Sequence, residues 1–315
     1  MTRVGTVPGV ANPSFLAPAG DRLYAVNEQA SGDVTAVSLR GGRPEVLNSQ
    51  SVEGAGPCHL SVHPGGRYLL SACFVSGSVA VHPIAPDGRL GRPTDLVTYP
   101  GPDPGQKDGS RPHQVLTDPQ GRFVLSVDLG TDLIHTSLLD TGTGKLTAVS
   151  RARVQAGAGP RHLAFHPSGR FAYVAAELSS SVIVCGYDPP TGRLTPGVPQ
   201  PTVPAGGPPP AGPNLPAEVL VSPDGAYVYV SNRGHDSISR FAVGGSGGTL
   251  TLLDTVPTGG AGPRHISLDP SGALLFAANQ NSDSVTVFHR DAAFGTLTPA
   301  GAPFATPGPV FVLPA

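Results

Sequence analysis

The chain has 315 residues, including 42 glycines and 36 prolines, and its formal net charge at pH 7 is −2. Both glycine and proline destabilise helix interiors, so this composition excludes a protein built from long helices. Only 13% of the residues are charged and they form no basic block, which argues against nucleic-acid binding. Because 39% of the chain is hydrophobic and falls in short runs, we expect a β protein with many tight turns rather than a disordered chain.

The cysteines and the start of the chain carry little signal. Cys58, Cys73 and Cys185 lack the paired spacing of a zinc site, and they do not suggest a disulfide framework. The first residues lack the apolar core of a secretion signal, and no segment of 18 apolar residues exists. We therefore expect a cytoplasmic protein with no membrane partner. The oligomeric state is left open, with a monomer favoured.

The predicted elements repeat along the chain. A proline opens a short first strand at Pro13, and the same start recurs at Pro57, Pro112, Pro160, Pro216 and Pro263. Each first strand runs into a Pro-x-Gly turn. A second strand is then predicted over residues 23–27, 68–72, 123–127, 171–175, 227–231 and 274–278. A third strand follows, as at 78–81, 181–184 and 284–288, and a glycine turn such as 87–90, 143–146 or 191–194 leads to a fourth.

Four short antiparallel strands in a repeat of roughly 50 residues are typical of a β-propeller blade. The two ends of the chain add two more expected strands, Arg3–Val7 as a fourth strand and Pro309–Val312 as a first strand. We therefore predict an all-β, seven-bladed type of propeller: six complete blades and a partial closing blade formed by both termini. Residues 1–315 are expected to form a single domain, with ordered or semi-rigid loops at 100–111 and 196–216.

The repeats also predict where a site lies. The start of the first strand and the end of the second meet at one rim, where residue types change from copy to copy. The ionisable residues at this rim are His113, Arg161, His162, Glu177, Glu218, Arg233, Arg264 and His265. Such a cluster in a concave position indicates a functional site. The alternative is that these side chains pair with one another and close the channel.

Other candidate chemistry is weaker. His63, Asp118 and His166 lie beside the Pro-x-Gly turns at the opposite end and are expected to stabilise them. The sequence has no HExxH motif and no Gly-x-Ser-x-Gly motif, so we expect neither a metal site nor a serine triad.

Several segments carry a family resemblance. Gly159–Gly169, Tyr173–Glu177, Tyr229–His235 and Gly262–His265 together resemble the propeller-type 6-phosphogluconolactonase family. The resemblance covers nearly the whole chain. It implies a seven-bladed propeller with no required cofactor and a lactonase of the pentose phosphate pathway. Family members normally begin with about two more strands, which this sequence lacks.

The resemblance also implies site residues. The His, Arg, Glu and second Arg implicated in the family fall on His113, Arg161, Glu177 and Arg233. We expect hydrolysis of a sugar lactone, 6-phosphogluconolactone to 6-phosphogluconate, with Glu177 or His113 as general base and the arginines stabilising the acid or oxyanion. Substrate contacts are expected from His59, His162, Glu218, Asn232, Arg264 and His265.

Two other functions stay open. The same site is suited to a carboxymuconate-type cyclisation or to a secondary-metabolite lactone. A non-catalytic propeller that binds a partner is the alternative from another class, motivated by the incomplete blade and the proline-rich residues 196–216. Such a scaffold would show an apolar patch on the rim, whereas the rim positions are mostly polar.

Overall fold

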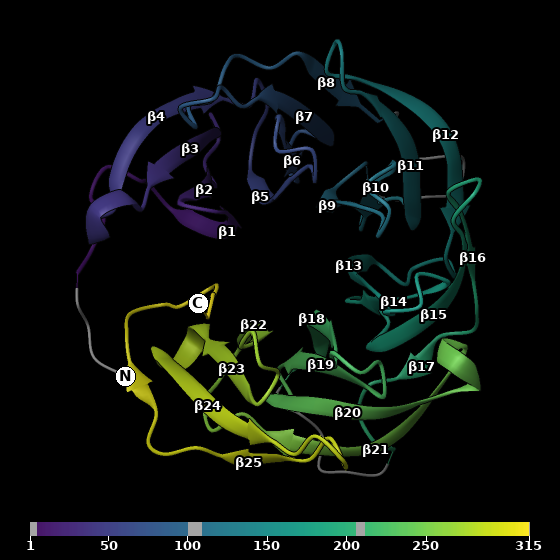
Figure 1. Ribbon diagram of the computed structural model, residues 1–315. Coiled ribbons are helices and arrows are strands. Elements are labelled where there is room, and N and C mark those ends of the chain that lie inside the picture. The colour runs from purple at the N-terminus through teal and green to yellow at the C-terminus, as the bar shows by residue number, and fades with distance from the viewer. Residues whose placement is uncertain (1–4, 100–108, 206–211, 315) are drawn as a thin grey trace. The chain divides into compact units, whose positions relative to one another are not determined.

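The computed structural model describes residues 5–99, 109–205 and 212–314. The described residues form six main sheets, three in each of two compact units. The first unit holds the described residues up to 153 and the turn 189–193, and the second unit holds the described residues of 154–188 and 194–314. In every sheet four strands lie side by side in chain order (Figure 1). Six sheets, each with four strands in chain order, are what the six predicted blades require.

The first unit contains three sheets and one 3₁₀ helix, η1 (Arg40–Gly42). Its first sheet is β1 (Pro13–Ala19), β2 (Arg22–Asn27), β3 (Asp33–Ser38) and β4 (Glu45–Ser51). Its second is β5 (Pro57–Val62), β6 (Tyr68–Cys73), β7 (Ser78–Pro83) and β8 (Asp95–Thr98). Its third is β9 (Pro112–Thr117), β10 (Phe123–Asp128), β11 (Leu133–Asp140) and β12 (Lys145–Arg153).

The second unit contains the other three sheets and the 3₁₀ helices η2 (Gly245–Gly247) and η3 (Gln280–Ser282). The fourth sheet is β13 (Pro160–Phe165), β14 (Phe171–Ala176), β15 (Ser181–Asp188) and β16 (Arg193–Pro196), with β17 (Gln200–Pro201) added on β15. The fifth is β18 (Leu215–Val221), β19 (Tyr227–Arg233), β20 (Ser237–Gly244) and β21 (Thr249–Pro257). The sixth is β22 (Pro263–Leu268), β23 (Leu274–Asn279), β24 (Ser284–Arg290) and β25 (Leu297–Pro299), with β26 (Phe304–Ala305) added on β24.

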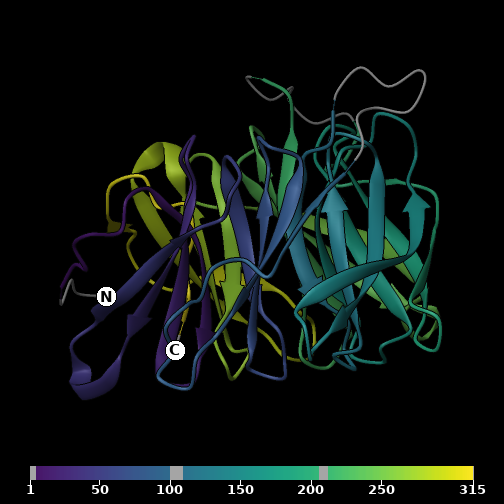
Figure 2. The ribbon, with the colours of Figure 1, turned by 90° about the horizontal axis from the view of Figure 1, so that it is seen from above.

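The Pro-x-Gly turns join the first two strands of each sheet, and Figure 2 shows the strands lengthwise with turns at both ends. The turn glycine takes a left-handed conformation, with φ of 69° at Gly66, which other residues adopt only with strain. His63 Nδ1 accepts a hydrogen bond from Gly65 N, and Asp118 Oδ1 accepts bonds from the amides of Arg122 and Phe123. The turn-stabilising role predicted for these side chains is confirmed, and His166 makes the same bond to Ser168 N.

Neighbouring sheets within a unit pack through apolar side chains. Tyr24, Tyr173 and Tyr229 occupy the same position in their strands and are buried. Each donates its hydroxyl proton to the carbonyl of a glycine in the last hairpin of the next sheet. The acceptors are Gly88 at 3.1 Å, Gly247 at 2.9 Å and Gly295 at 2.7 Å. A buried tyrosine therefore supplies apolar contact and satisfies its own polar group.

The predicted strands differ from the structure at three places. The fourth strand of the second sheet begins at Asp95, because Leu90 forms only an isolated bridge with Ile84. Pro309–Val312 is not a strand, and neither are residues 5–7 of the predicted strand Arg3–Val7. A strand needs a hydrogen-bonded neighbour, and neither segment pairs with one among the described residues.

Pro309–Val312 nevertheless repeats contacts made by a first strand. The Phe311 ring lies 4.0 Å from the His265 ring, and Val312 N donates to His265 Nδ1 over 3.4 Å. In the first unit, His59 has the same two contacts: its ring lies 4.0 Å from that of Phe15, and Val115 N donates to its Nδ1 over 3.4 Å. The C-terminal segment thus makes contacts typical of a first strand, although residues 309–312 are not a strand.

The structure describes only part of the residues on which the predictions about loops and domain organisation depend. The loops at 100–111 and 196–216 fall in part outside the described residues. The single domain over residues 1–315 stays a prediction. In the described part of the chain, no helical segment has the length and hydropathy needed to span a bilayer.

Candidate functional site

The candidate site of the second unit is built at the starts of first strands and the ends of second strands. Pro160 pairs with Ala176 and His162 pairs with Ala175, so the register shifts at Arg161. Such a bulge leaves one extra residue unpaired and re-aims its side chain. The same shift between Pro263 and His265 places Arg264 at a bulge. The local geometry therefore explains how two adjacent polar residues, an arginine and a histidine, both serve one rim.

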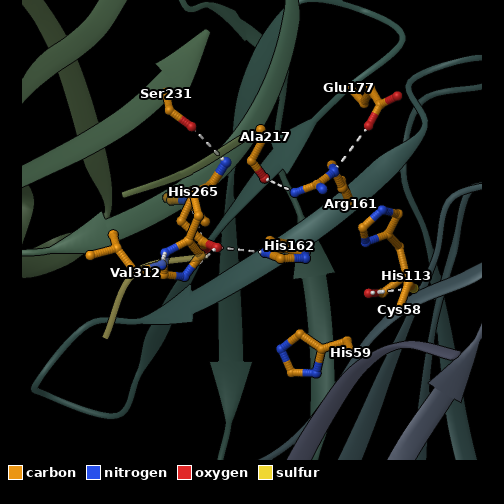
Figure 3. Close-up of polar contacts among 12 residues, drawn as sticks. Cys58, His59, His113, Arg161, His162, Glu177, Ala217, Ser231, His265 and Val312 are labelled. Atoms are coloured by element: carbon orange, nitrogen blue, oxygen red, sulfur yellow. Dashed lines mark hydrogen bonds and ion pairs between the residues drawn. The ribbon is translucent and has the colours of Figure 1, made fainter. Parts of the chain in front are cut away.

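Glu177 lies between two arginines from different strands. Its Oε2 atom is 3.1 Å from Arg161 Nε and 2.7 Å from Arg233 Nη2. Both arginines are themselves held by backbone carbonyls: Arg161 Nη1 donates to Ala217 O over 2.6 Å, and Arg233 Nε donates to Leu215 O over 3.3 Å. Figure 3 shows the Arg161 guanidinium between Ala217 and Glu177. The carboxylate is thus fixed from two sides.

The two arginines differ in exposure. The side chain of Arg161 is 3% exposed, whereas those of Glu177 and Arg233 are each 17% exposed. Burial and the charges of Arg233 and Arg264 lower the pKa of Arg161 to about 9, against the opposing charge of Glu177. Burial also lowers the pKa of Arg233, again opposed by Glu177. Both groups stay protonated at neutral pH, with Arg161 beneath the site and Arg233 open to it.

A second cluster adjoins these residues. Glu218 Oε2 lies 2.9 Å from His162 Nδ1 and 3.4 Å from His265 Nε2. Glu218 Oε1 accepts a bond from Val219 N over 3.1 Å. Because His265 Nδ1 accepts from Val312 N, the proton of neutral His265 is on Nε2 and faces the carboxylate.

Burial dominates the titration of this cluster. It lowers the pKa of His265 to about 4, although the charge of Glu218 opposes the shift. It lowers the pKa of His162 well below the usual value, assisted by the charge of Arg161 and the other arginines. It raises the pKa of Glu218, although His265 and Arg161 oppose this. The histidines are therefore neutral at pH 7 and donate hydrogen bonds rather than carry charge.

Arg264 adds a third cation. Its charge is close enough to lower the pKa values of Arg161 and Arg233. Its side chain is partly exposed and, within the described residues, it has no ion pair. Three guanidiniums therefore face two carboxylates, Glu177 and Glu218, so this rim attracts anions.

Two predicted residues, His59 and His113, belong to the first unit and are described there. The ring of His113 contacts Phe74 edge to face, with centroids 5.5 Å apart, and Cys58 Sγ donates to the His113 carbonyl over 3.5 Å. The His59 ring is tilted against the Phe15 ring, with centroids 4.0 Å apart. Both histidines are buried. Their predicted roles stay predictions.

Asn232 is engaged in the protein interior. It is fully buried, its amide donates to Ser239 Oγ over 2.7 Å, and its carbonyl accepts from Asn214 Nδ2 over 3.2 Å. No polar atom is thus turned toward a substrate, and we leave Asn232 out of the proposed site. Sequence reasoning missed the carbonyls of Leu215 and Ala217, because a backbone acceptor has no signal in residue type. Over residues 5–99, 109–205 and 212–314, no three His, Cys, Asp or Glu side chains are placed to hold a metal ion.

Comparison with known proteins gives consistent matches. Residues 1–314 match the protein family described as "Lactonase, 7-bladed beta-propeller". The 6-phosphogluconolactonase of Bacillus subtilis is 34% identical over 259 residues, which cover 80% of this chain and 72% of that protein. A crystal structure of a Lactobacillus plantarum protein has a TM-score of 0.90 and 34% identity, covering 98% of this chain and 89% of that one. The periplasmic gluconolactonase PpgL of Pseudomonas aeruginosa has a TM-score of 0.85 and 29% identity, covering 95% and 86%. The predicted fold class, an all-β propeller, is confirmed.

Proposed function

Because the chain belongs to the lactonase family of seven-bladed β-propellers, we propose that it hydrolyses a lactone. The similar proteins from Bacillus subtilis and Pseudomonas aeruginosa are named 6-phosphogluconolactonase and gluconolactonase, which favours a sugar lactone as substrate. The observation that carries the proposal is the partly exposed Glu177 carboxylate fixed between Arg161 and Arg233.

Glu177 is the proposed general base. Both ion pairs use Oε2, and Oε1 pairs with no side chain among the described residues. Oε1 would take a proton from a water molecule as its oxygen forms a bond to the lactone carbonyl carbon. When the bond between that carbon and the ring oxygen breaks, protonated Glu177 returns the proton to the ring oxygen. The products are an open-chain carboxylic acid and a hydroxyl group.

The arginines are proposed to divide two tasks. Arg233 is open to the site and would stabilise the negative charge that develops on the carbonyl oxygen. Arg264 has no ion pair among the described side chains and would bind an anionic group of the substrate. Arg161 is buried and would position Glu177. With three guanidiniums against two carboxylates, we propose the phosphorylated lactone, 6-phosphogluconolactone, over its uncharged analogue.

The test is an assay of the purified full chain. We expect hydrolysis of 6-phosphogluconolactone well above the spontaneous rate and slower turnover of glucono-1,5-lactone. Glu177→Gln should lower kcat at least about 100-fold, the usual scale of general-base catalysis. The matched control is Glu45→Gln, because Glu45 is exposed on β4.

Three results would count against the proposal. A wild-type rate equal to the spontaneous rate for both lactones would exclude lactonase function. Full activity of Glu177→Gln would exclude Glu177 as the base. Cyclisation of a carboxymuconate without lactone hydrolysis would favour the reverse reaction at the same residues.

A further inference from the structure

A cavity unrelated to these residues lies in the first unit, between the outer strands of its second and third sheets. It has a volume of about 320 Å³ and is lined by β8, β11, β12 and Tyr99. Val97, Leu133 and Leu146 supply apolar lining. The volume is at the lower end of the range for small-molecule sites. β8, the fourth strand of the second sheet, has only four residues, whereas β12 of the third sheet has nine. The cavity lies beside this short strand.

The repeats mark one position in this cavity as different. In three sheets the second-strand residue that pairs with the first residue of the third strand is an asparagine, which bonds to a hydroxyl on the third strand. In the third sheet the corresponding pair is Asp128 and His135, with Oδ2 and Nε2 3.6 Å apart. An ionisable pair thus replaces a neutral one where the cavity lies. The neutral pairs are Asn27 with Thr35, Asn232 with Ser239, and Asn279 with Thr286.

Asp128 is well supported as a carboxylate. It accepts hydrogen bonds from Ser110 Oγ and Arg111 N, each over 2.7 Å, and from Gly130 N over 3.0 Å. Burial would raise its pKa, but His135, Ser110 and the Arg111 amide outweigh that effect and hold the pKa below its usual value. Asp128 Oδ2 thus places a buried negative charge 3.6 Å from His135 Nε2.

His135 and Tyr99 form an aromatic pair. Their rings are stacked, with centroids 3.9 Å apart and planes 14° apart, so each ring covers one face of the other. Arg151 on β12 is the strand partner of His135, is exposed, and also lines the cavity. Ser137 and Ser150 are small residues of the same lining, which leaves room beside these rings. The cavity therefore combines a stacked aromatic pair, apolar side chains, the buried Asp128 carboxylate behind His135 and a cation at its edge.

We propose that this cavity binds a small aromatic carboxylate. The ring of the ligand would pack against the stacked pair of Tyr99 and His135, and its carboxylate would pair with Arg151 at the edge of the cavity. The site uses none of the residues assigned to lactone hydrolysis.

The experiment uses benzoate as the probe and benzamide as its uncharged counterpart, with binding followed by calorimetry and by the imidazole nitrogen signals of His135. We expect saturable benzoate binding at one site and at least about tenfold weaker binding of benzamide. Arg151→Ala should weaken benzoate binding at least about tenfold. Ser150→Phe should fill the cavity and abolish it. Arg92→Ala is the matched control, since Arg92 is exposed in the same unit but does not line the cavity.

Each of several results overturns the proposal. These are no saturable benzoate binding to the wild-type protein, equal binding of benzamide, and binding unchanged by both Arg151→Ala and Ser150→Phe. An equal loss in Arg92→Ala would also overturn it, because binding would then depend on overall charge. Arg151→Ala is a surface change and keeps the test valid if Ser150→Phe, checked by circular dichroism, does not fold.

Discussion

Nδ1 of His162 lies 2.9 Å from Oε2 of Glu218, which is 56 residues further along the chain on the next sheet. His265, on the sheet after that, places Nε2 3.4 Å from the same oxygen. One carboxylate therefore links three successive sheets of the second unit. Because all three side chains are buried, any change in their protonation affects the folded state directly.

Stability should depend on pH through His265. Its folded-state pKa is about 4, while an unfolded histidine titrates near 6.5. Below pH 6.5 the unfolded chain binds a proton that the folded state does not, so His265 should lower the free energy of unfolding as pH falls toward 4. The full effect is on the order of 3 kcal/mol. Glu218 has the opposite effect on the free energy of unfolding. Because its pKa is raised, the folded state binds a proton at a higher pH than the unfolded chain does.

Urea unfolding between pH 7 and pH 4 measures this effect. His265→Gln should be less stable than wild type at pH 7 and show a flatter pH dependence. His289→Gln is the control, because His289 is exposed and should leave the slope unchanged. An identical slope in wild type and His265→Gln would contradict the prediction.

Arg264→Ala should separate binding from turnover. If Arg264 binds the phosphate group, its loss should raise KM for 6-phosphogluconolactone about tenfold or more, the scale of a hydrogen bond to a charged group. KM for glucono-1,5-lactone should change little. Steady-state kinetics on both lactones, with Arg170→Ala as an exposed-arginine control, test this. Equal increases in KM for both substrates would show that Arg264 does not distinguish the phosphate.

Tyr229→Phe should destabilise the second unit. It removes the 2.7 Å bond to Gly295 O and leaves a buried carbonyl without that donor, at a cost of about 1–3 kcal/mol. Tyr227→Phe is the matched control, since Tyr227 Oη donates to Ala293 O in the same hairpin at an exposed position. Chemical denaturation should give the larger loss for Tyr229→Phe. The reverse order would mean that burial does not set the cost.

Gly295→Ala should be more harmful than Gly20→Ala. Both glycines have left-handed backbones, with φ of 67° and 58°, so each change costs about 1 kcal/mol of backbone strain. A Cβ at Gly295 would lie 2.5 Å from the Tyr227 ring, whereas at Gly20 no atom lies within 4 Å. We expect a further loss of about 1–3 kcal/mol for Gly295→Ala alone, measured by urea unfolding. Equal losses would show that the tyrosine moves aside freely.

The repeats were sufficient to predict the sheets. Proline starts and Pro-x-Gly turns have fixed backbone preferences, so strands such as β6 and β10 fall where the sequence places them. The resemblance to the lactonase family is also confirmed. The fourth strands were harder to predict. Leu90 was expected to lead into one, but it makes only a single bridge with Ile84, and β8 begins at Asp95. Their ends depend on packing against other strands rather than on a local signal.

The site was predictable in part for a similar reason. Residue types at the strand ends indicated Arg161, Glu177 and Arg233, which the structure brings into contact. The sequence did not indicate that the Asn232 side chain is buried in the protein interior. An amide can hydrogen-bond a substrate as readily as it bonds Ser239 here. Nor did the sequence single out His135, whose importance depends on a stack with Tyr99, which directly follows β8 of another sheet. Such relationships arise only when segments far apart in sequence meet.

The contacts of Phe311 and Val312 with His265 have a practical consequence for handling the protein. A purification tag fused directly after Ala315 would lie only a few residues from Phe311 and Val312. A clone that lacks the residues from Pro309 onward would lose the Val312 amide that fixes the His265 tautomer. Lactonase preparations that carry tags at opposite ends should therefore be compared before any rate is attributed to the native enzyme.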